Sequence, residues 1–135
     1  MRKTFFILAV LLCTLTVSIN AQSAVSTENA KNFVNKDTTV VGVATQVNTT
    51  KSGVTFINMD GKFPENKFSA IIYKDDSSKF EDVKKMEGKT IEVSGKIQEY
   101  NGKYNIVLKE PKQLKEVDHK AEKKSAKATK KTGKK

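Results

Sequence analysis

The stretch GKTIEVSGKIQEYNGKYNIVL, residues 88–108, decides the fold. Polar and apolar residues alternate strictly over residues 90–98, and the apolar positions are Ile91, Val93, Gly95 and Ile97. A period of two is typical of a strand with one buried face. Asn-Gly at 101–102 accepts the positive φ angles of a two-residue type I′ turn, so residues 104–108 are expected to return beside the first strand. The stretch therefore predicts a β-hairpin.

Three further strands are expected upstream of this hairpin. Residues 39–47 alternate, and we expect Val41, Val43 and Val47 on the buried face. Residues 54–59 and 68–73 are short and rich in β-branched and aromatic side chains, which favour strands. The turn sequence Thr-Lys-Ser-Gly at 50–53 separates the first two strands, and a connection containing Gly and Pro separates the second from the third.

One helix is expected between the third and fourth strands. Ser78 and Glu81 have the spacing of a capping box, and Gly88 suits the C-terminal end. The apolar stripe of this helix would consist of Phe80, Val83 and Met86. A shorter helical pattern begins at Ser26 and carries Ala30, Phe33 and Val34 on one side.

The order strand, strand, strand, helix, strand, strand predicts an all-β protein with one helix, folded as a five-stranded OB barrel. Gly42 and Gly95 lie in the middle of the two longest strands, where a small barrel needs sharp coiling. An SH3-like barrel is the structural alternative, but it lacks a helix of this length at this place. We expect the barrel domain to occupy residues 22–117.

The first 21 residues have the pattern of a secretory signal peptide. Arg2 and Lys3 precede a short apolar run, and small residues ending at Ala21 offer a cleavage site. Leu12 precedes the single cysteine, Cys13, where the bacterial lipobox needs a small residue, so a lipid anchor is not expected. The protein is predicted to be exported, periplasmic or extracellular, with no membrane span after cleavage.

The positive charge is concentrated in the C-terminal residues. From Lys112 onward there are ten lysines and three acids, whereas residues 22–111 hold 13 lysines and 12 acids. Residues 118–135 lack Val, Leu, Ile and aromatic side chains, and this composition predicts a disordered tail. The tail is the expected polyanion binder, through Lys120, Lys123, Lys124, Lys127, Lys130, Lys131, Lys134 and Lys135. The alternative is that the tail binds no ligand and only increases the solubility of the protein.

Two longer stretches resemble a known group of domains. These are VTFINMDGKFPENKFSAIIYKDDSSKF at 54–80 and GKTIEVSGKIQEYNGKYNIVLKEPKQL at 88–114. They resemble the OB-fold domains that accompany nucleases in bacterial secreted proteins or stand alone in small exported ones. The resemblance spans residues 26–114 and implies binding of nucleic acid or an oligosaccharide. Fold kinship alone does not establish function.

Enzymatic activity is not expected, and neither is a cofactor or a bound metal. Beyond residue 21 the chain has no Arg and no Cys, and its single histidine, His119, lies in the tail. The OB fold hosts a calcium-dependent staphylococcal-type nuclease, but such an enzyme holds phosphate with arginines, whose bidentate fork lysine lacks. Asp75 and Asp76 are interpreted as helix N-terminal charges rather than as a cation site.

The candidate ligand face of the barrel is formed by the second and third strands and by the loops at their borders. Aromatic rings there would stack bases and lysines would contact phosphates. The candidate residues are Phe56, Asn58, Phe63, Lys67, Phe68, Tyr73, Lys74, Tyr100, Lys103 and Tyr104. Because the sequence does not set the strand register, Phe56 and Phe68 either fill the barrel or face the ligand, and core is the favoured interpretation.

Two functional hypotheses remain open. In the first, the protein binds single-stranded nucleic acid or another polyanion without sequence specificity, using the barrel face and the tail. In the second, the barrel binds an envelope protein or a saccharide, and the tail attaches the protein to anionic surfaces. Both ligands occur outside the cytoplasm.

Overall fold

The computed structural model describes residues 23–117, so the predicted signal peptide and lysine-rich tail lie outside the described residues. No helix among residues 23–117 is long and apolar enough to cross a membrane. The strands are β1 (Val25–Ser26), β2 (Asp37–Thr49), β3 (Thr55–Met59), β4 (Phe68–Ile72), β5 (Thr90–Tyr100), β6 (Lys103–Leu108) and β7 (Leu114–Glu116). The 3-10 helices are η1 (Ala30–Phe33), η2 (Lys74–Lys79), η3 (Val83–Met86) and η4 (Pro111–Gln113).

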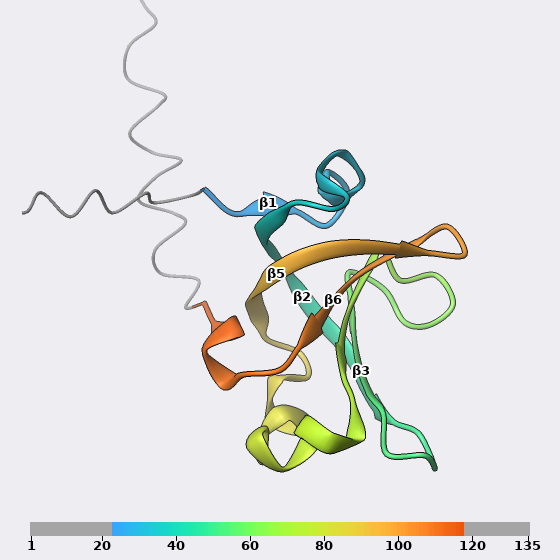
Figure 1. Cartoon of the computed structure of the whole chain (residues 1–135), viewed down its shortest axis with the longest axis vertical. Helices are drawn as coiled ribbons and strands as arrows, with labels where there is room; N and C mark the ends of the chain where they lie inside the picture. Colours follow the sequence, from blue (N-terminus) through green and yellow to red (C-terminus); the bar gives the residue numbers. More distant parts are fainter. Residues whose placement is uncertain (1–22, 118–135) are drawn as a thin grey trace, which may run out of the picture.

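Five of these strands close into a barrel (Figure 1). The neighbours run β2–β3–β4–β6–β5, and β5 pairs back onto β2. The β4–β6 pair is parallel, whereas the other four barrel pairs are antiparallel. This five-stranded barrel confirms the predicted OB-like fold. The short strands β1 and β7, which the sequence patterns did not indicate, pair with the outer edges of β2 and β5.

The barrel interior is filled by alternate residues of each strand. Ile91, Val93 and Ile97 of β5 are fully buried, as their alternation predicted. Burial alternates in the same way along β4, whereas β3 and β6 also bury Asn58 and Asn105 on the face that lies outside the core. The largest fully buried side chains are Phe68, Ile57, Met59, Ile72, Ile91, Ile97, Ile106, Leu108, Val40 and Val93.

The predicted buried face of the first strand was wrong. Val40 and Ala44 are fully buried, whereas Val43 is 38% exposed. The strand carries valines at both odd and even positions, so its alternation fits two opposite phases. A register shift between Ala44 and Gln46 then changes the phase within the strand, and Val47 returns to the core.

The predicted helix over 78–88 is replaced by η2 and η3, and Ser78 does not cap a helix. The N-terminal helical pattern likewise forms only the 3-10 turn η1. Phe80, Val83 and Met86 still pack against the core, as expected. Val83 and Met86 lie three residues apart in η3, and the 3.0 residues per turn of a 3-10 helix place them on one face, whereas Phe80 is the residue that follows η2.

The two mid-strand glycines are required by close approaches. Gly95 has a φ of +153°, and a Cβ there would lie 2.8 Å from Cγ2 of Ile106. At Gly42 a Cβ would lie 2.6 Å from Oδ2 of Asp60, the oxygen that accepts a hydrogen bond from Thr27. The predicted hairpin turn is confirmed, since both of its central residues, Asn101 and Gly102, have positive φ.

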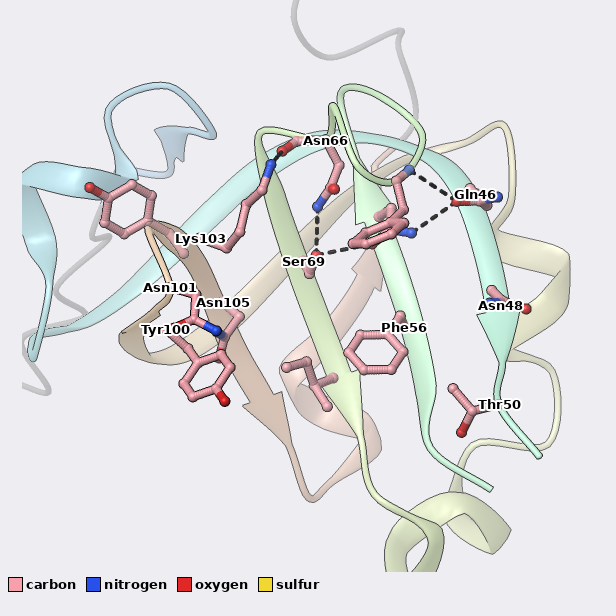
Figure 2. Close-up of a pocket in the computed structure, with 14 residues that line it drawn as sticks. Gln46, Asn48, Thr50, Phe56, Asn66, Ser69, Tyr100, Asn101, Lys103 and Asn105 are labelled. Atoms are coloured by element: carbon pink, nitrogen blue, oxygen red, sulfur yellow. Dashed lines mark hydrogen bonds between the residues drawn. The ribbon is translucent and has the colours of Figure 1, made fainter. Parts of the chain in front are cut away.

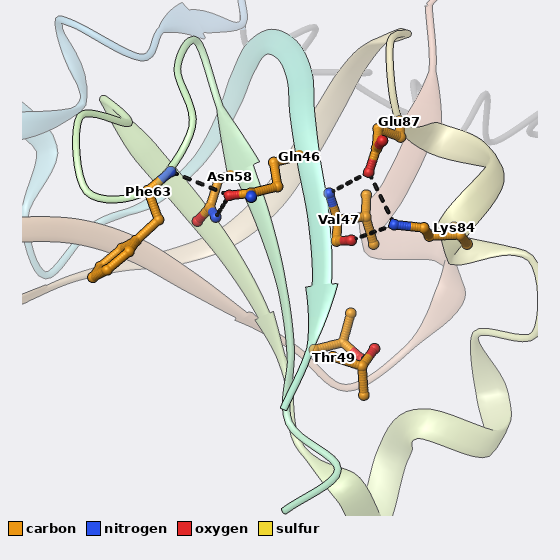
Figure 3. A network of polar contacts seen from close by, with 8 residues as sticks. Gln46, Val47, Thr49, Asn58, Phe63, Lys84 and Glu87 are labelled. Atoms are coloured by element: carbon orange, nitrogen blue, oxygen red, sulfur yellow. Dashed lines mark hydrogen bonds and ion pairs between the residues drawn. The ribbon is translucent and has the colours of Figure 1, made fainter. Parts of the chain in front are cut away.

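Strand β2 leaves β5 after Val43, and its freed edge is covered by the segment around η3 (Figure 3). The Val47 N–H donates to the Glu87 carboxylate at 2.8 Å, and the Lys84 ammonium donates to the Val47 carbonyl at 2.6 Å. Lys84 and Glu87 also form an ion pair, in which Lys84 Nζ lies 3.1 Å from Glu87 Oε2. This ion pair replaces the missing strand partner by satisfying both backbone groups of Val47.

We predict that Glu87→Gln lowers stability in a pH-dependent way. The hydrogen bond from Val47 and the contact with Lys84 hold the pKa of Glu87 below its ordinary value. A carboxylate whose pKa is lowered by folding stabilises the protein above its unfolded-state pKa, and this contribution disappears as the pH falls through the folded-state pKa. The wild type should therefore melt higher than the variant at neutral pH, and the difference should shrink as the pH falls below the ordinary pKa of a glutamate, 4.5, and through the lower folded-state pKa.

Thermal unfolding followed by circular dichroism measures this difference. Asp82→Asn is the matched control, because Asp82 forms an exposed ion pair with Lys85 in the same segment and binds no strand backbone. A Glu87→Gln melting curve that tracks that of Asp82→Asn at every pH would contradict the proposed role of Glu87.

Candidate ligand-binding site

A cavity of about 520 Å³ lies on the outer face of β2, β3 and β4, between the β3–β4 loop and the β5–β6 hairpin (Figure 2). Asn48 and Thr50 lie on one side of it, and Tyr100 and Asn101 lie on the other. The lining residues are Gln46, Asn48, Thr50, Phe56, Asn58, Phe63, Asn66, Ser69, Ile71, Tyr100, Asn101, Lys103, Tyr104 and Asn105. This is the face on which OB barrels commonly bind oligonucleotides and oligosaccharides.

The floor of the cavity consists of two rows that run across the strands. The first row is polar, because the pairing register aligns Gln46 with Asn58, Asn58 with Ser69, and Ser69 with Asn105. The second row aligns Asn48, Phe56 and Ile71. Neighbours on one face of a sheet lie close enough for direct side-chain contact, so each row is a continuous strip.

Hydrogen bonds within the polar row all run in one direction. Asn66 Nδ2 donates to Ser69 Oγ at 2.7 Å, the Ser69 hydroxyl donates to Asn58 Oδ1 at 3.0 Å, and Asn58 Nδ2 donates to Gln46 Oε1 at 3.0 Å. Backbone groups set this direction at both ends. The Phe63 N–H donates to Gln46 Oε1 (Figures 2 and 3). At the other end, the Phe68 carbonyl accepts from Asn66.

The backbone contacts at the two ends of this row of hydrogen bonds require the same orientation of every side-chain amide between them. A backbone N–H only donates and a carbonyl only accepts, so neither terminal contact tolerates an exchange of amide oxygen and nitrogen. The four side chains Gln46, Asn58, Asn66 and Ser69 therefore form a fixed framework. We call this set the amide framework.

Aromatic side chains project from both borders of the cavity. Phe63, which precedes Pro64 through a cis peptide bond, is 72% exposed, and Tyr100 is 73% exposed. Lys103 connects the same two borders, because its ammonium donates to the carbonyls of Pro64 at 2.5 Å and Asn66 at 3.4 Å. The cavity thus has flat apolar groups at its edges and amide groups on its floor.

The structure brings together six of the ten barrel residues proposed from the sequence. These are Phe56, Asn58, Phe63, Tyr100, Lys103 and Tyr104. The favoured core interpretation is correct for Phe68, which is fully buried and so cannot contact a ligand on the outer face. It is wrong for Phe56, because β3 directs Ile57 and Met59 inward and Phe56 toward the cavity.

The other three proposed barrel residues lie away from the cavity lining. Tyr73 precedes η2 and Lys74 begins it. The Lys67 ammonium lies 3.7 Å from the carboxylate of Glu28, and both side chains are exposed. The eight proposed tail lysines lie outside the described residues.

Sequence reasoning missed most of the polar lining. The missed residues are Gln46, Asn48, Thr50, Asn66, Ser69, Ile71, Asn101 and Asn105. A usable signal was present, since Gln46 and Asn48 are two residues apart on one strand and thus share a face. The opposing amides belong to other strands, and only the pairing register aligns them.

The cavity lining is nearly neutral. Lys103 is the one charged residue among the 14 that line the cavity, and its ammonium is engaged by backbone carbonyls. Within residues 23–117, no group of three or more His, Cys, Asp or Glu side chains is arranged to hold a metal ion. The site offers stacking surfaces and neutral hydrogen-bonding groups rather than a charged cradle.

We predict that Asn58→Leu destabilises the barrel by about 1–3 kcal/mol, because it removes the buried amide that bonds to Ser69 and Gln46 and leaves these two half-buried side chains with unmade hydrogen bonds. Urea unfolding measures this loss. Asn48→Leu is the matched control: it removes an amide from the same cavity, but the Asn48 side chain is exposed and outside the amide framework. Equal stability of the two variants would show that the framework does not hold the floor in place.

Comparisons with known proteins support the fold. No family model matches the chain, and no curated protein matches it. Among solved structures, the chain is similar to a protein described as an aspartyl-tRNA synthetase from Leishmania major Friedlin, with a TM-score of 0.51 and 8% sequence identity. The match covers 77% of this chain and 22% of the length of that protein. At this identity the likeness shows the fold alone.

Proposed function

We propose that this protein is an exported, non-enzymatic OB-fold binding protein whose barrel face holds bases of single-stranded nucleic acid. One observation carries this proposal: Phe63 and Tyr100 border an amide-rich floor that also carries Phe56, on the face where OB barrels bind extended ligands. Aromatic rings accept stacked bases whatever their identity, and amides bond to base edges. A cavity of about 520 Å³ is within the ordinary range for ligand sites.

The phosphates would be contacted mainly outside the cavity. Single-stranded nucleic acid binds through stacking together with a cationic path for its backbone, and the cavity lining supplies only one lysine. The eight lysines of residues 118–135 are the densest positive charge in the chain and are proposed for this purpose. The barrel would thus hold bases while the tail holds phosphates.

Export and the lack of catalysis are proposed from the sequence. The pattern of residues 1–21 supports export, and the absence of Arg and Cys after residue 21 supports a binding protein rather than a nuclease. The resemblance of residues 26–114 to the OB domains of bacterial secreted proteins supports the same compartment and ligand class. The protein described as a tRNA synthetase supports only the fold.

A second candidate function is binding of a neutral oligosaccharide. The near-neutral lining favours it, because sugars need amide and hydroxyl partners together with an aromatic surface but no cation. In that case the tail would attach the protein to anionic surfaces of the envelope. An envelope protein as the barrel ligand belongs to the same alternative.

Truncating the exposed aromatic residues should weaken nucleic-acid binding. We expect Phe63→Ala and Tyr100→Ala each to raise the Kd for a labelled single-stranded DNA by about 5- to 150-fold, which corresponds to the loss of one stacked base. Fluorescence anisotropy with the protein from residue 22 to residue 135 measures this change.

Tyr73→Ala is the matched control, because Tyr73 is 49% exposed but lies outside the cavity lining. It should leave the Kd unchanged. An equal effect of all three substitutions would contradict binding in this cavity. Calorimetric titration with neutral oligosaccharides decides between the two candidate functions. If an oligosaccharide binds saturably, and if Phe63→Ala abolishes this binding but leaves the Kd for DNA unchanged, the ligand of the cavity is a saccharide and not nucleic acid.

Removing the tail should reduce the salt dependence of nucleic-acid binding but leave the binding site on the barrel intact. A chain ending at Val117 keeps β7 and the hydrogen bond from Val117 to Thr90. For single strands, each phosphate contact contributes about 0.7 to the slope of log K against log salt concentration. We expect truncation to lower the magnitude of this slope by up to about 6 and to leave residual binding at low salt.

Anisotropy titrations at several salt concentrations measure the slope. If the shortened chain does not bind even at low salt, the barrel is not a nucleic-acid site. If the slope is unchanged, the tail does not contact phosphates. Heparin and anionic vesicles test the tail separately, and equal binding of these and of DNA would identify it as a general polyanion adhesive.

A further inference from the structure

The strongest unexplained feature of the cavity is the side chain of Asn105. It lies on β6 in the floor, next to Ser69 in the parallel pairing, and is only 7% exposed. Its amide has no hydrogen-bond partner among residues 23–117. Buried amides are almost always paired, so an unpaired one calls for a physical explanation.

The amide framework does not extend to Asn105. The single hydroxyl proton of Ser69 is donated to Asn58, so Ser69 has no proton left for the oxygen of Asn105. One lone pair of the Ser69 oxygen accepts from Asn66, and Asn105 makes no hydrogen bond to the other. The row of hydrogen bonds ends one residue before Asn105, although the register continues to it. Its carboxamide keeps both a donor and an acceptor unused.

The unused amide of Asn105 is accessible from the cavity. Within residues 23–117, the fully enclosed side-chain polar atoms that lack partners belong to Thr38 and Asn66, and Asn105 contributes none. Asn105 also lines the cavity, and its amide is drawn there in Figure 2. A side chain that is more than nine-tenths buried thus presents its only polar group to the ligand space.

We propose that Asn105 is the specificity-determining residue of this site and that it pairs with the edge of a nucleobase. This inference rests on the proposed function. A carboxamide presents an N–H donor beside a C=O acceptor in one plane, and the edges of the bases present different patterns of the same groups. Base identity is therefore read at Asn105, whereas stacking on Phe63 and Tyr100 is indifferent to it.

This role has a signature that a structural role lacks. In the free protein the Asn105 side chain makes no hydrogen bond to residues 23–117, so a leucine of similar size removes no bond that stabilises the fold. Asn105→Leu should therefore weaken binding without lowering the melting temperature. Replacement of an asparagine that stabilises the fold would lower the melting temperature.

The test compares Asn105→Leu, Asn105→Asp and Asn32→Leu in the protein from residue 22 to residue 135. The probes are labelled oligo(dA), oligo(dC) and oligo(dT) of equal length. We expect the wild type to discriminate among them by about tenfold or more, and Asn105→Leu to reduce the spread to about twofold. Asn32 is an exposed asparagine outside the cavity lining, so Asn32→Leu should keep the wild-type order and melting temperature.

Asn105→Asp has nearly the same shape but lacks the N–H donor, so it should also lose the discrimination, and it provides a folded variant if the leucine protein does not fold. Three outcomes overturn the inference: a lower melting temperature of Asn105→Leu, a base preference that survives both substitutions, or a wild type that binds all three probes equally. Failure of the wild type to bind any probe overturns the proposed function itself, and the inference with it.

Discussion

Strand β2 pairs with β5 through residues 37–43 and with β3 through residues 44–49, and this double pairing closes the barrel. The change of partner needs a register shift, which lies between Ala44 and Gln46. Beyond that point the strand edge no longer faces β5, so Glu87 and Lys84 bind the backbone of Val47 instead. The closure of the barrel, the position of the bulge and the irregular segment around η3 therefore all follow from the change of partner along β2.

The same pairing creates the cavity floor. Once β2, β3, β4 and β6 are in register, their outer faces align the amides and the hydroxyl of one row and the apolar side chains of the next. Backbone groups at Phe63 and Phe68 fix the direction of the amide framework, so the floor is already ordered before a ligand arrives. A preorganised floor reduces the entropy lost on binding, and it leaves Asn105 as the buried floor amide without a partner among the described residues.

The concentrated positive charge and the binding cavity belong to different segments of the chain. The cavity lining holds one lysine, and its ammonium is bound to the carbonyls that border the cavity. Eight lysines follow residue 117. Long-range attraction and short-range recognition would therefore be supplied by different segments, which permits affinity for polyanions to vary with salt while the selectivity of the cavity does not.

The sequence by itself determined the β-hairpin at 88–108, the inward face of β5, the order of the five barrel strands and the fold class that follows from this order. These features depend on local alternation and turn chemistry, which neighbouring residues carry. The tertiary structure alone decided which valines of β2 are buried, that Phe56 faces the cavity while Phe68 fills the core, and that the segment after β4 forms 3-10 turns. It also assembled the amide framework and placed Asn105 beside it. The physical reason is register: a shift of one residue exchanges the two faces of a strand, and partners distant in sequence set that shift.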